Sequence, residues 1–335
     1  MELYENHLAH SYWGSRINQL PQLAHYFPFE FGVSFSATDI PGNRLDSTDK
    51  LRQEYPTYGT GDMRCPALQV ENAAGDSITR LRYESHRIFS GKPVLSGLPA
   101  TYGDDCETLE ITLTDELTGI TAVLNYTVFP EKDVLTRSVR IENRGNTACT
   151  LEKAASFCLD LHQDGFEVIH LHGAWAKERH IQRLPQSAAT MVFDSKRGAS
   201  SHNENPFIAL VRPETTEDYG DAYGFCLMYS GSFSAEVSGE QYGSTRVQMG
   251  IQPLGFSWEL APGESFQTPE AILVYSGNGL GEMSRIFHKI IRENVCRGKF
   301  RDTERPVLIN NWEATYFSFN QEKILALAKK LRPSV

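Results

Sequence analysis

Four histidines between residues 162 and 180 are the first side chains that could do chemistry, because clustered imidazoles can bind zinc. They are His162, His170, His172 and His180. On a β-strand, His170 and His172 would share one face and Leu171 would lie on the other. Zinc sites usually need three or four converging ligands, and this spacing supplies two. The sequence therefore predicts no metal site and no cofactor.

Two further groups of reactive side chains are weaker candidates for a functional site. Asp104 and Asp105 could bind a cation, but they follow Gly103 in a turn-like segment with no histidine at ligand spacing. A solvated turn is the better interpretation. The serines at 200 and 201 precede His202 directly, but chain neighbours rarely face each other productively, and no glycine elbow surrounds them. A serine hydrolase is therefore not expected.

Aromatic residues are the better candidates for a binding site. Trp175 is flanked by small and polar residues, where a core tryptophan is less expected, and its flat indole could stack on the apolar face of a sugar. A structural tryptophan packed under a loop is the equal alternative. Trp312 ends a short apolar run that begins at Arg305. If this run is a strand of a (β/α) barrel, Trp312 would face the active-site mouth.

Composition and charge exclude several classes of function. The chain has 335 residues with a formal net charge of −10, whereas a nucleic-acid binder needs a basic face. No apolar run approaches the roughly 18 residues of a membrane span, and the acidic start lacks a secretory pattern. The cysteines occur singly, which predicts buried free thiols in a reduced, cytoplasmic protein. They are Cys65, Cys106, Cys149, Cys158, Cys226 and Cys296.

The elements that position these residues are mostly strands. From about residue 65 to 275, apolar residues alternate with polar ones in short runs, which predicts strands with one buried face. Segments 142–146 and 261–264 have the composition of turns. Many strands with short turns indicate a mainly β, large antiparallel sandwich. The clearest runs are Leu109, Ile111 and Leu113; Ala122, Leu124, Tyr126 and Val128; and Val247, Met249 and Ile251.

The pattern changes near residue 279. Met283, Ile286, Phe287 and Ile290 recur at helical spacing, and the basic and glycine residues at 297–299 are expected to end that helix. The run 305–312 predicts a strand, and a second helix is expected at about 320–331. Strand, loop and helix are how a (β/α) barrel begins. We therefore expect a sandwich domain at 1–278, a linker helix at 279–304 and the start of a barrel at 305–335.

Several long strings resemble family 36 glycoside hydrolases, the microbial α-galactosidase and raffinase group. The nearest match is RPVLINNWEATYF at 305–317, which is similar to that family's first barrel strand. The matches are collinear, so chance is a poor explanation for them. The others are QEYPTYGTGDMR at 53–64, GLPATY at 97–102, GAW at 173–175, RGASSHNENPF at 197–207 and PGESFQTPE at 262–270.

The resemblance implies an amino-terminal β-supersandwich followed by a catalytic (β/α)₈ barrel, of which this chain holds the first β/α unit. It implies retaining hydrolysis of terminal α-galactosides such as melibiose and raffinose by two carboxyl groups. It also implies a tetramer and a galactose site lined by Trp175 and Trp312. Arg44 matches loosely an arginine that a neighbouring subunit contributes. Asp62 and Arg64 match well, with a structural role as the stronger alternative.

The family's catalytic strings, Lys-Trp-Asp and Asp-Asp-Gly-Trp, do not occur in this sequence. We therefore expect no catalytic residue here and no hydrolysis by this chain alone. The resemblance also leads us to expect that a first strand is missing before residue 7 and that the barrel is truncated after residue 328. A non-catalytic carbohydrate-binding or assembly module is the alternative function.

Overall fold

The computed structural model of the protein describes residues 1–18, 48, 50–240 and 242–331. The chain divides into two compact units, Met1–Val295 and Cys296–Val335.

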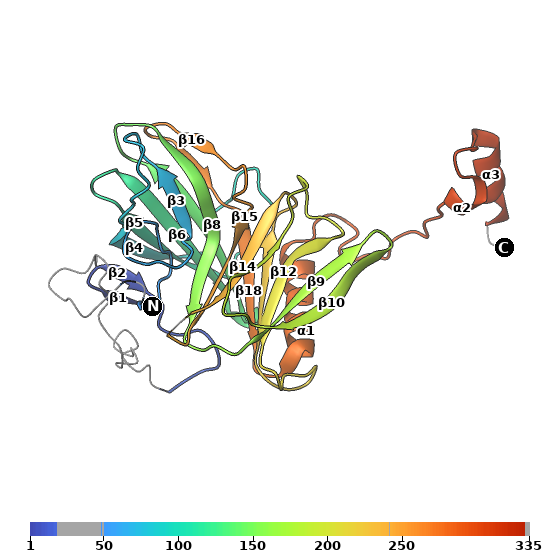
Figure 1. The fold of residues 1–335 in the computed structure, drawn as a ribbon. Coiled ribbons are helices and arrows are strands. Elements are labelled where there is room, and N and C mark those ends of the chain that lie inside the picture. Colours follow the sequence, from blue (N-terminus) through green and yellow to red (C-terminus); the bar gives the residue numbers. More distant parts are fainter. Residues whose placement is uncertain (19–47, 49, 241, 332–335) are drawn as a thin grey trace. The chain divides into compact units, whose positions relative to one another are not determined.

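The first unit is built on two antiparallel sheets (Figure 1). Within the described residues, the larger sheet has ten strands in the order β10-β9-β12-β13-β18-β7-β6-β5-β4, with β17 also paired to β7. The smaller sheet has the order β11-β14-β15-β8-β16, with β3 also paired to β8. Strands β1 (Glu2–Tyr4) and β2 (His7–Ala9) form a separate hairpin.

The strands of the larger sheet are β4 (Arg82–Ser90), β5 (Glu107–Thr114), β6 (Ile120–Phe129), β7 (Val134–Asn143), β9 (Glu167–Ala174), β10 (Lys177–Pro185), β12 (Glu204–Val211), β13 (Ala222–Met228), β17 (Ser265–Gln267) and β18 (Glu270–Ser276). Those of the smaller sheet are β3 (Leu68–Glu71), β8 (Cys149–Leu161), β11 (Met191–Asp194), β14 (Phe233–Gly239), β15 (Thr245–Ile251) and β16 (Trp258–Leu260). A short 3₁₀ helix, Pro130–Lys132, joins β6 to β7.

The predicted mainly β fold is confirmed, and the three clearest period-two runs are strands β5, β6 and β15. The expectation of one buried face is wrong for β6 and β15. The second face of β6 carries Thr121, Val123 and Asn125, and these are buried, as are Ala122 and Leu124 on the first. A central strand with a neighbour on each edge, as β6 has in β5 and β7, can bury a face that carries polar residues.

Buried apolar side chains form three clusters, and strand β18 shows how two of them are divided. Leu273 belongs to the core between the two sheets, whereas its neighbours Ile272 and Val274 belong to a cluster on the opposite face. That second cluster includes Met283 and Phe287 of helix α1 (Gly279–Asn294). Because successive strand residues point to opposite faces, β18 packs on both sides.

Helix α1 covers the outer face of the larger sheet at β13 and β18. Its predicted apolar stripe is buried, and Gly224 of β13 allows the close approach, since a Cβ there would lie 2.5 Å from the Phe287 ring. The helix ends at Asn294, before the expected stop at 297–299. Asn294 donates a side-chain hydrogen bond to the Tyr102 carbonyl (2.7 Å), which anchors this end. In the described chain, no helix has the length and apolar character needed to cross a membrane.

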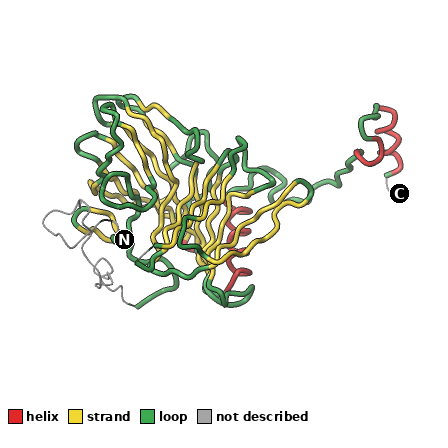
Figure 2. The backbone as a smooth tube through the Cα atoms, in the orientation of Figure 1, coloured by secondary structure: helices red, strands yellow, loops and turns green. Residues whose placement is uncertain are grey.

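The second unit contains helices α2 (Trp312–Thr315) and α3 (Gln321–Lys330). Helix α3 confirms the helix expected at about 320–331, and Asn320 caps it by accepting from the Lys323 backbone N–H (2.9 Å). The strand expected at 305–312 is wrong for this structure, since the segment before α2 is loop (Figure 2). A strand needs a neighbour for its backbone hydrogen bonds, and the described residues of this unit supply none. The expected domain boundaries stay predictions.

Candidate functional site

The hairpin of β9 and β10 carries Trp175 in its turn. Ala174 pairs with Lys177 across the two strands, which leaves Trp175 and Ala176 as the loop. Ala176 has a φ of 61°, the left-handed conformation that tight hairpin turns need. The Trp175 side chain is 83% exposed. The expectation that this indole is not a core residue is therefore confirmed, whereas its role in binding stays a prediction.

The base of this hairpin is supported by the loop before β12 and by the first residues of that strand. Gly173 donates a backbone hydrogen bond to the Asn203 carbonyl (3.0 Å), and Asn203 returns one from its side chain to the Gly173 carbonyl (3.3 Å). Arg179 donates to the Asn205 side chain (3.2 Å). Glycine is required at 173, because a Cβ there would lie 2.3 Å from the Lys177 carbonyl oxygen. These contacts hold the turn that presents Trp175.

The serines noted beside His202 serve the loop. The Ser200 backbone N–H donates to the Ser230 carbonyl (2.8 Å), and the Ser201 hydroxyl accepts from the Asn203 backbone (3.2 Å).

In the hairpin turn, Glu178 accepts from the Ala176 backbone N–H (2.9 Å), and hydrogen bonds from its own backbone and from Ala176 lower the pKa of this carboxyl. The turn thus presents a fixed anion beside an exposed indole.

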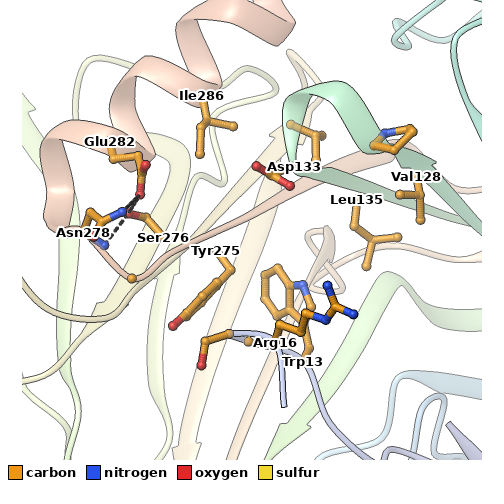
Figure 3. A pocket seen from close by; sticks show the side chains of 15 residues that line it. Trp13, Arg16, Val128, Asp133, Leu135, Tyr275, Ser276, Asn278, Glu282 and Ile286 are labelled. Carbon is orange, nitrogen blue, oxygen red and sulfur yellow. Dashed lines mark hydrogen bonds between the residues drawn. The ribbon is translucent and has the colours of Figure 1, made fainter. Parts of the chain in front are cut away.

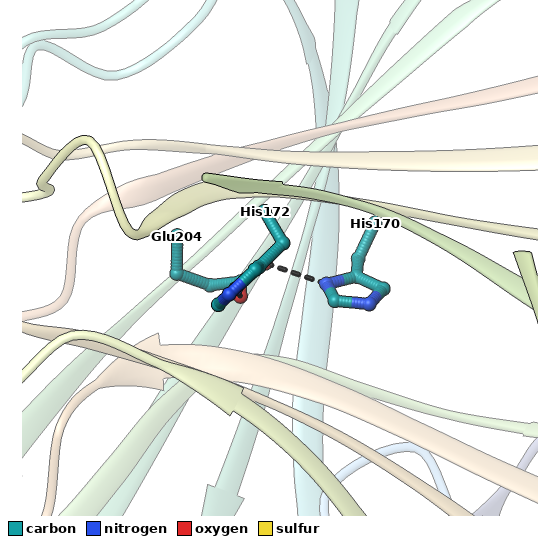
Figure 4. Close-up of side chains that lie close together, drawn as sticks. All are labelled: His170, His172 and Glu204. Atoms are coloured by element: carbon teal, nitrogen blue, oxygen red, sulfur yellow. Dashed lines mark hydrogen bonds and ion pairs between the residues drawn. The ribbon is translucent and has the colours of Figure 1, made fainter. Parts of the chain in front are cut away.

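The four histidines lie in different surroundings, and Glu204 contacts two of them. His170 and His172 both face Glu204 on β12, which confirms that they share a face of their strand (Figure 4). His180 is the cross-strand neighbour of His172 on β10, and the ring of His162 lies 6.1 Å from that of Tyr12. Sequence reasoning missed Glu204, although it falls inside the string at 197–207.

The matched pair Asp62 and Arg64 belongs to a buried ion-pair network. Arg64 donates to Asp62 (2.8 Å), Arg246 donates to Asp62 (3.0 Å) and to Asp160 (2.7 Å), and Gln53 donates to Asp62 (2.7 Å). Burial alone would raise the pKa of Asp160, but the charges of Arg246 and Arg64 and hydrogen bonds from Arg246 and the Gln53 backbone lower it to about 2. These side chains hold the loop around residue 62 against the smaller sheet. Their role is therefore structural.

Asp104 and Asp105 are both exposed, and Asp105 forms an ion pair with Lys132, whose side chain is buried. Asp105 accepts from Lys132 (2.5 Å), and this hydrogen bond lowers the pKa of the carboxyl. None of the six cysteines forms a disulfide, as expected, but the expectation that they are buried is wrong for Cys296, which is exposed, and Cys65 and Cys226 are only partly buried. Arg44 lies outside the described residues.

Trp312 begins helix α2 in the second unit and is 43% exposed. Its ring packs edge-on against Tyr316 (centroids 5.5 Å apart) and Phe317 (4.9 Å). Its backbone N–H donates to the Asn310 side chain (2.9 Å). The structure therefore places Trp312 in a small aromatic group of its own unit, and its role in binding stays a prediction.

A cavity of about 520 Å³ lies between the segment around Trp13, the β6–β7 turn and the start of α1 (Figure 3). Its lining includes Arg16, Tyr275 and Glu282, and Glu282 accepts from the Ser276 hydroxyl (2.7 Å). Sequence reasoning did not find it, because its walls come from segments more than a hundred residues apart.

Comparison with known proteins identifies the fold's family. The Glycosyl hydrolase family 36 N-terminal domain model matches residues 6–261, and the Melibiase model matches residues 265–334. The chain belongs to glycosyl hydrolase family 36. The resemblance seen in the sequence is therefore confirmed.

Two family 36 relatives show the extent of the match. The chain is 48% identical over 333 residues to the α-galactosidase AgaA of Geobacillus stearothermophilus, covering 98% of this chain and 45% of AgaA. It is 42% identical over 328 residues to the α-galactosidase Mel36A of Lactobacillus acidophilus, covering 97% of this chain and 45% of Mel36A. The chain thus spans about half the length of the relatives it matches.

Solved family 36 structures agree with this fold. A variant of AgaA in complex with raffinose superimposes with a TM-score of 0.95, covering 98% of this chain and 46% of that one. Another variant, in complex with stachyose, gives 0.94. The galactosidase domain of the α-galactosidase–sucrose kinase AgaSK gives 0.93 at 42% identity. The large antiparallel architecture is therefore that of the amino-terminal region of family 36 enzymes.

Proposed function

We propose that this chain forms the amino-terminal part of a retaining α-galactosidase that removes terminal α-galactose from galacto-oligosaccharides such as melibiose and raffinose. Family membership and the names of its relatives support the reaction class. The AgaA complexes with raffinose and stachyose support the substrate class. In such an enzyme, one carboxylate attacks the anomeric carbon and a second carboxyl group acts first as acid and then as base.

The observation that carries the sugar-binding part of the proposal is the exposed indole of Trp175. Trp175 is 83% exposed, whereas a tryptophan that serves to pack the core would be mostly buried. The hairpin beneath it is fixed by the Gly173–Asn203 hydrogen bonds, so little side-chain or loop ordering is needed on binding. An indole held in this way is suited to stack on the apolar face of a galactose ring.

Trp312 and Arg44 are proposed as further substrate contacts, with Arg44 acting from a neighbouring subunit of a homo-oligomer. Family matching supports both assignments. A cytoplasmic location is proposed because none of the six cysteines forms a disulfide. The catalytic strings of the family are not in the sequence, and we propose that these 335 residues have no galactosidase activity of their own.

The experiment uses a chimera in which this chain replaces the matched amino-terminal segment of AgaA. We expect the chimera to hydrolyse p-nitrophenyl α-galactoside and this chain alone to give no turnover above background. Trp175→Ala in the chimera should lower kcat/KM about tenfold to a hundredfold, because one stacking contact contributes about 1–3 kcal/mol by analogy with base stacking. Trp258→Ala is the matched control, because Trp258 is 50% exposed on a different strand, β16.

Hydrolysis by the isolated chain would contradict the proposed inactivity, and an unchanged kcat/KM in Trp175→Ala would contradict the stacking role. The same exposed Trp175 fits the alternative of a non-catalytic carbohydrate-binding module. Calorimetric titration of the isolated chain with raffinose separates the two. Affinity in the micromolar range would favour the binding module, whereas one stacking contact by itself predicts only very weak binding.

A further inference from the structure

We propose that His170, His172 and Glu204 form a binding site for a divalent transition-metal ion of the zinc class. Their donor atoms all lie within 4.8 Å of one another. The His170 Nδ1 lies 2.8 Å from Glu204 Oε1, and the His172 Nδ1 lies 3.1 Å from Glu204 Oε2 (Figure 4). Both imidazoles therefore converge on one carboxylate, and a single ion could replace the protons that now join them.

The sheet builds this convergence from two strands. His170 and His172 are two residues apart on β9 and share one face, and Glu204 pairs with His172 from β12. The register of β9 and β12 shifts between Glu204 and Ile208. Such irregularities re-aim side chains and are frequent next to functional sites. Here the irregular start of β12 places the carboxylate against both rings.

The partners of the buried Glu204 carboxylate are a second observation that supports a metal site, and it is independent of the geometry of the two rings. In the described part of the chain, seven carboxylate side chains are buried, and five of them contact a lysine or arginine. Asp115 is held instead by three backbone N–H groups. Among the residues that the structure describes, Glu204 has hydrogen bonds from two imidazoles and no lysine or arginine partner. The five with a basic partner are Glu54, Asp62, Asp160, Glu236 and Glu270.

A buried carboxylate needs compensating positive charge, because an isolated charge is costly to remove from water. A metal ion would supply that charge at Glu204, where the described residues provide no lysine or arginine. Two imidazoles and one carboxylate are ligands that suit Zn²⁺, Co²⁺ and Ni²⁺, whereas Ca²⁺ and Mg²⁺ take oxygen ligands. Ligands of a tetrahedral zinc ion lie about 3.3 Å apart, close to the hydrogen-bonded separations seen here.

The surroundings of the rings set the expected strength of binding. The His172 side chain is 48% exposed, which gives an ion and a completing water access from solvent. The His170 Nε2 is buried without a hydrogen-bond partner. Most histidine ligands have an outer hydrogen bond on that second nitrogen, and losing one typically weakens binding about 10- to 100-fold. We therefore expect weaker binding than at a complete four-ligand zinc site.

Metal binding would cross-link β9 to β12 three residues before Trp175, at the base of the hairpin. The test is calorimetric titration of the untagged full chain, freed of metal with a chelator, with ZnCl₂ at pH 7.5. The chain carries Cys296→Ser, because the exposed Cys296 thiol is a competing zinc ligand. We expect one bound equivalent, and binding that weakens at pH 5.5, where imidazoles take up protons.

His172→Ala and Glu204→Gln should each lower the zinc affinity at least about tenfold. His172→Ala removes a half-exposed side chain, so this variant should keep the fold, as circular dichroism would show. His288→Ala is the matched control, since His288 is an exposed histidine on α1. The proposal is overturned if the parent chain binds no zinc, or if one equivalent binds with unchanged affinity in both His172→Ala and Glu204→Gln.

Discussion

Replacing Asp160 with asparagine should destabilise the sandwich strongly. Asp160 lies on β8 and is completely buried, and it accepts from Arg246 at 2.7 Å through each of its two oxygens. It also accepts from the Gln53 backbone N–H (2.9 Å) and lies 3.3 Å from the Arg64 guanidinium. Asparagine keeps the shape but removes the charge, so two buried guanidiniums would face a single carboxylate, that of Asp62.

The magnitude follows from the cost of an unbalanced buried charge. Breaking a buried ion pair by removing one partner typically costs about 3–5 kcal/mol of unfolding free energy. The pH dependence gives a second measure. Burial would raise the pKa of Asp160, yet Arg246 and Arg64 lower it from 3.8 to about 2. A difference of about two pKa units corresponds to about 2–3 kcal/mol.

The sign of this pH effect is fixed by the direction of the shift. Because the folded-state pKa of Asp160 is depressed, its stabilisation is fully present above the unfolded pKa near 4. It is lost as the pH falls from about 4 to about 2, through the folded-state pKa. The asparagine variant lacks this contribution and should lose less stability than the parent chain over that window.

Urea unfolding followed by circular dichroism, at pH 7 and at several values down to pH 2.5, measures both effects. Asp105→Asn is the matched control, because Asp105 is half exposed and its partner Lys132 keeps Glu293 within 3.5 Å. This change should cost no more than about 1 kcal/mol. An Asp160→Asn variant that unfolds within about 1 kcal/mol of the parent chain at pH 7, with the same acid dependence, would refute the network's role.

Two further predictions concern backbone approach and exposed helices. Gly173→Ala should lower the unfolding midpoint and increase proteolysis of the β9–β10 hairpin, because the added Cβ would lie 2.3 Å from the Lys177 carbonyl oxygen; unchanged cleavage would contradict this. The amides of Ile324 and Leu327 in α3 should exchange with solvent faster than those of the core strand β15, because no residue of α3 is buried. Equal protection in a hydrogen-exchange experiment would show that α3 is packed.

Much of the fold could be predicted because it depends on short-range patterns. The period-two runs at β5 and β15 alternate apolar with polar residues. Such a run indicates a strand, because in a strand alternate side chains lie on the same face. The stripe of Met283, Phe287 and Ile290 marked α1, since only a helix brings residues at that spacing onto one side. The long strings at 53–64 and 305–317 carried the family resemblance, which the family models then confirmed.

Other parts of the prediction failed because they depended on neighbours that local pattern does not specify. The run 305–312 has the composition of a strand, but the described residues of its unit offer no strand to pair with it. Likewise, the single-sided pattern of β6 did not show that both of its faces are covered. A strand's backbone bonds and a sheet's second layer are supplied by distant segments, so the sequence of the strand cannot decide them.

By itself, the sequence determined the apolar faces of the strands and of helix α1 and the family, and it left the setting of Trp175 open between exposed and packed. Only the tertiary structure decided which distant side chains meet. Glu204 joins His170 and His172 because β12 pairs with β9, and Asp160 meets Arg246 and Asp62 because β8 lies beside β15 and the loop around residue 62. Local patterns report which face of an element is apolar, whereas polar clusters form where strands from separate parts of the chain come into register.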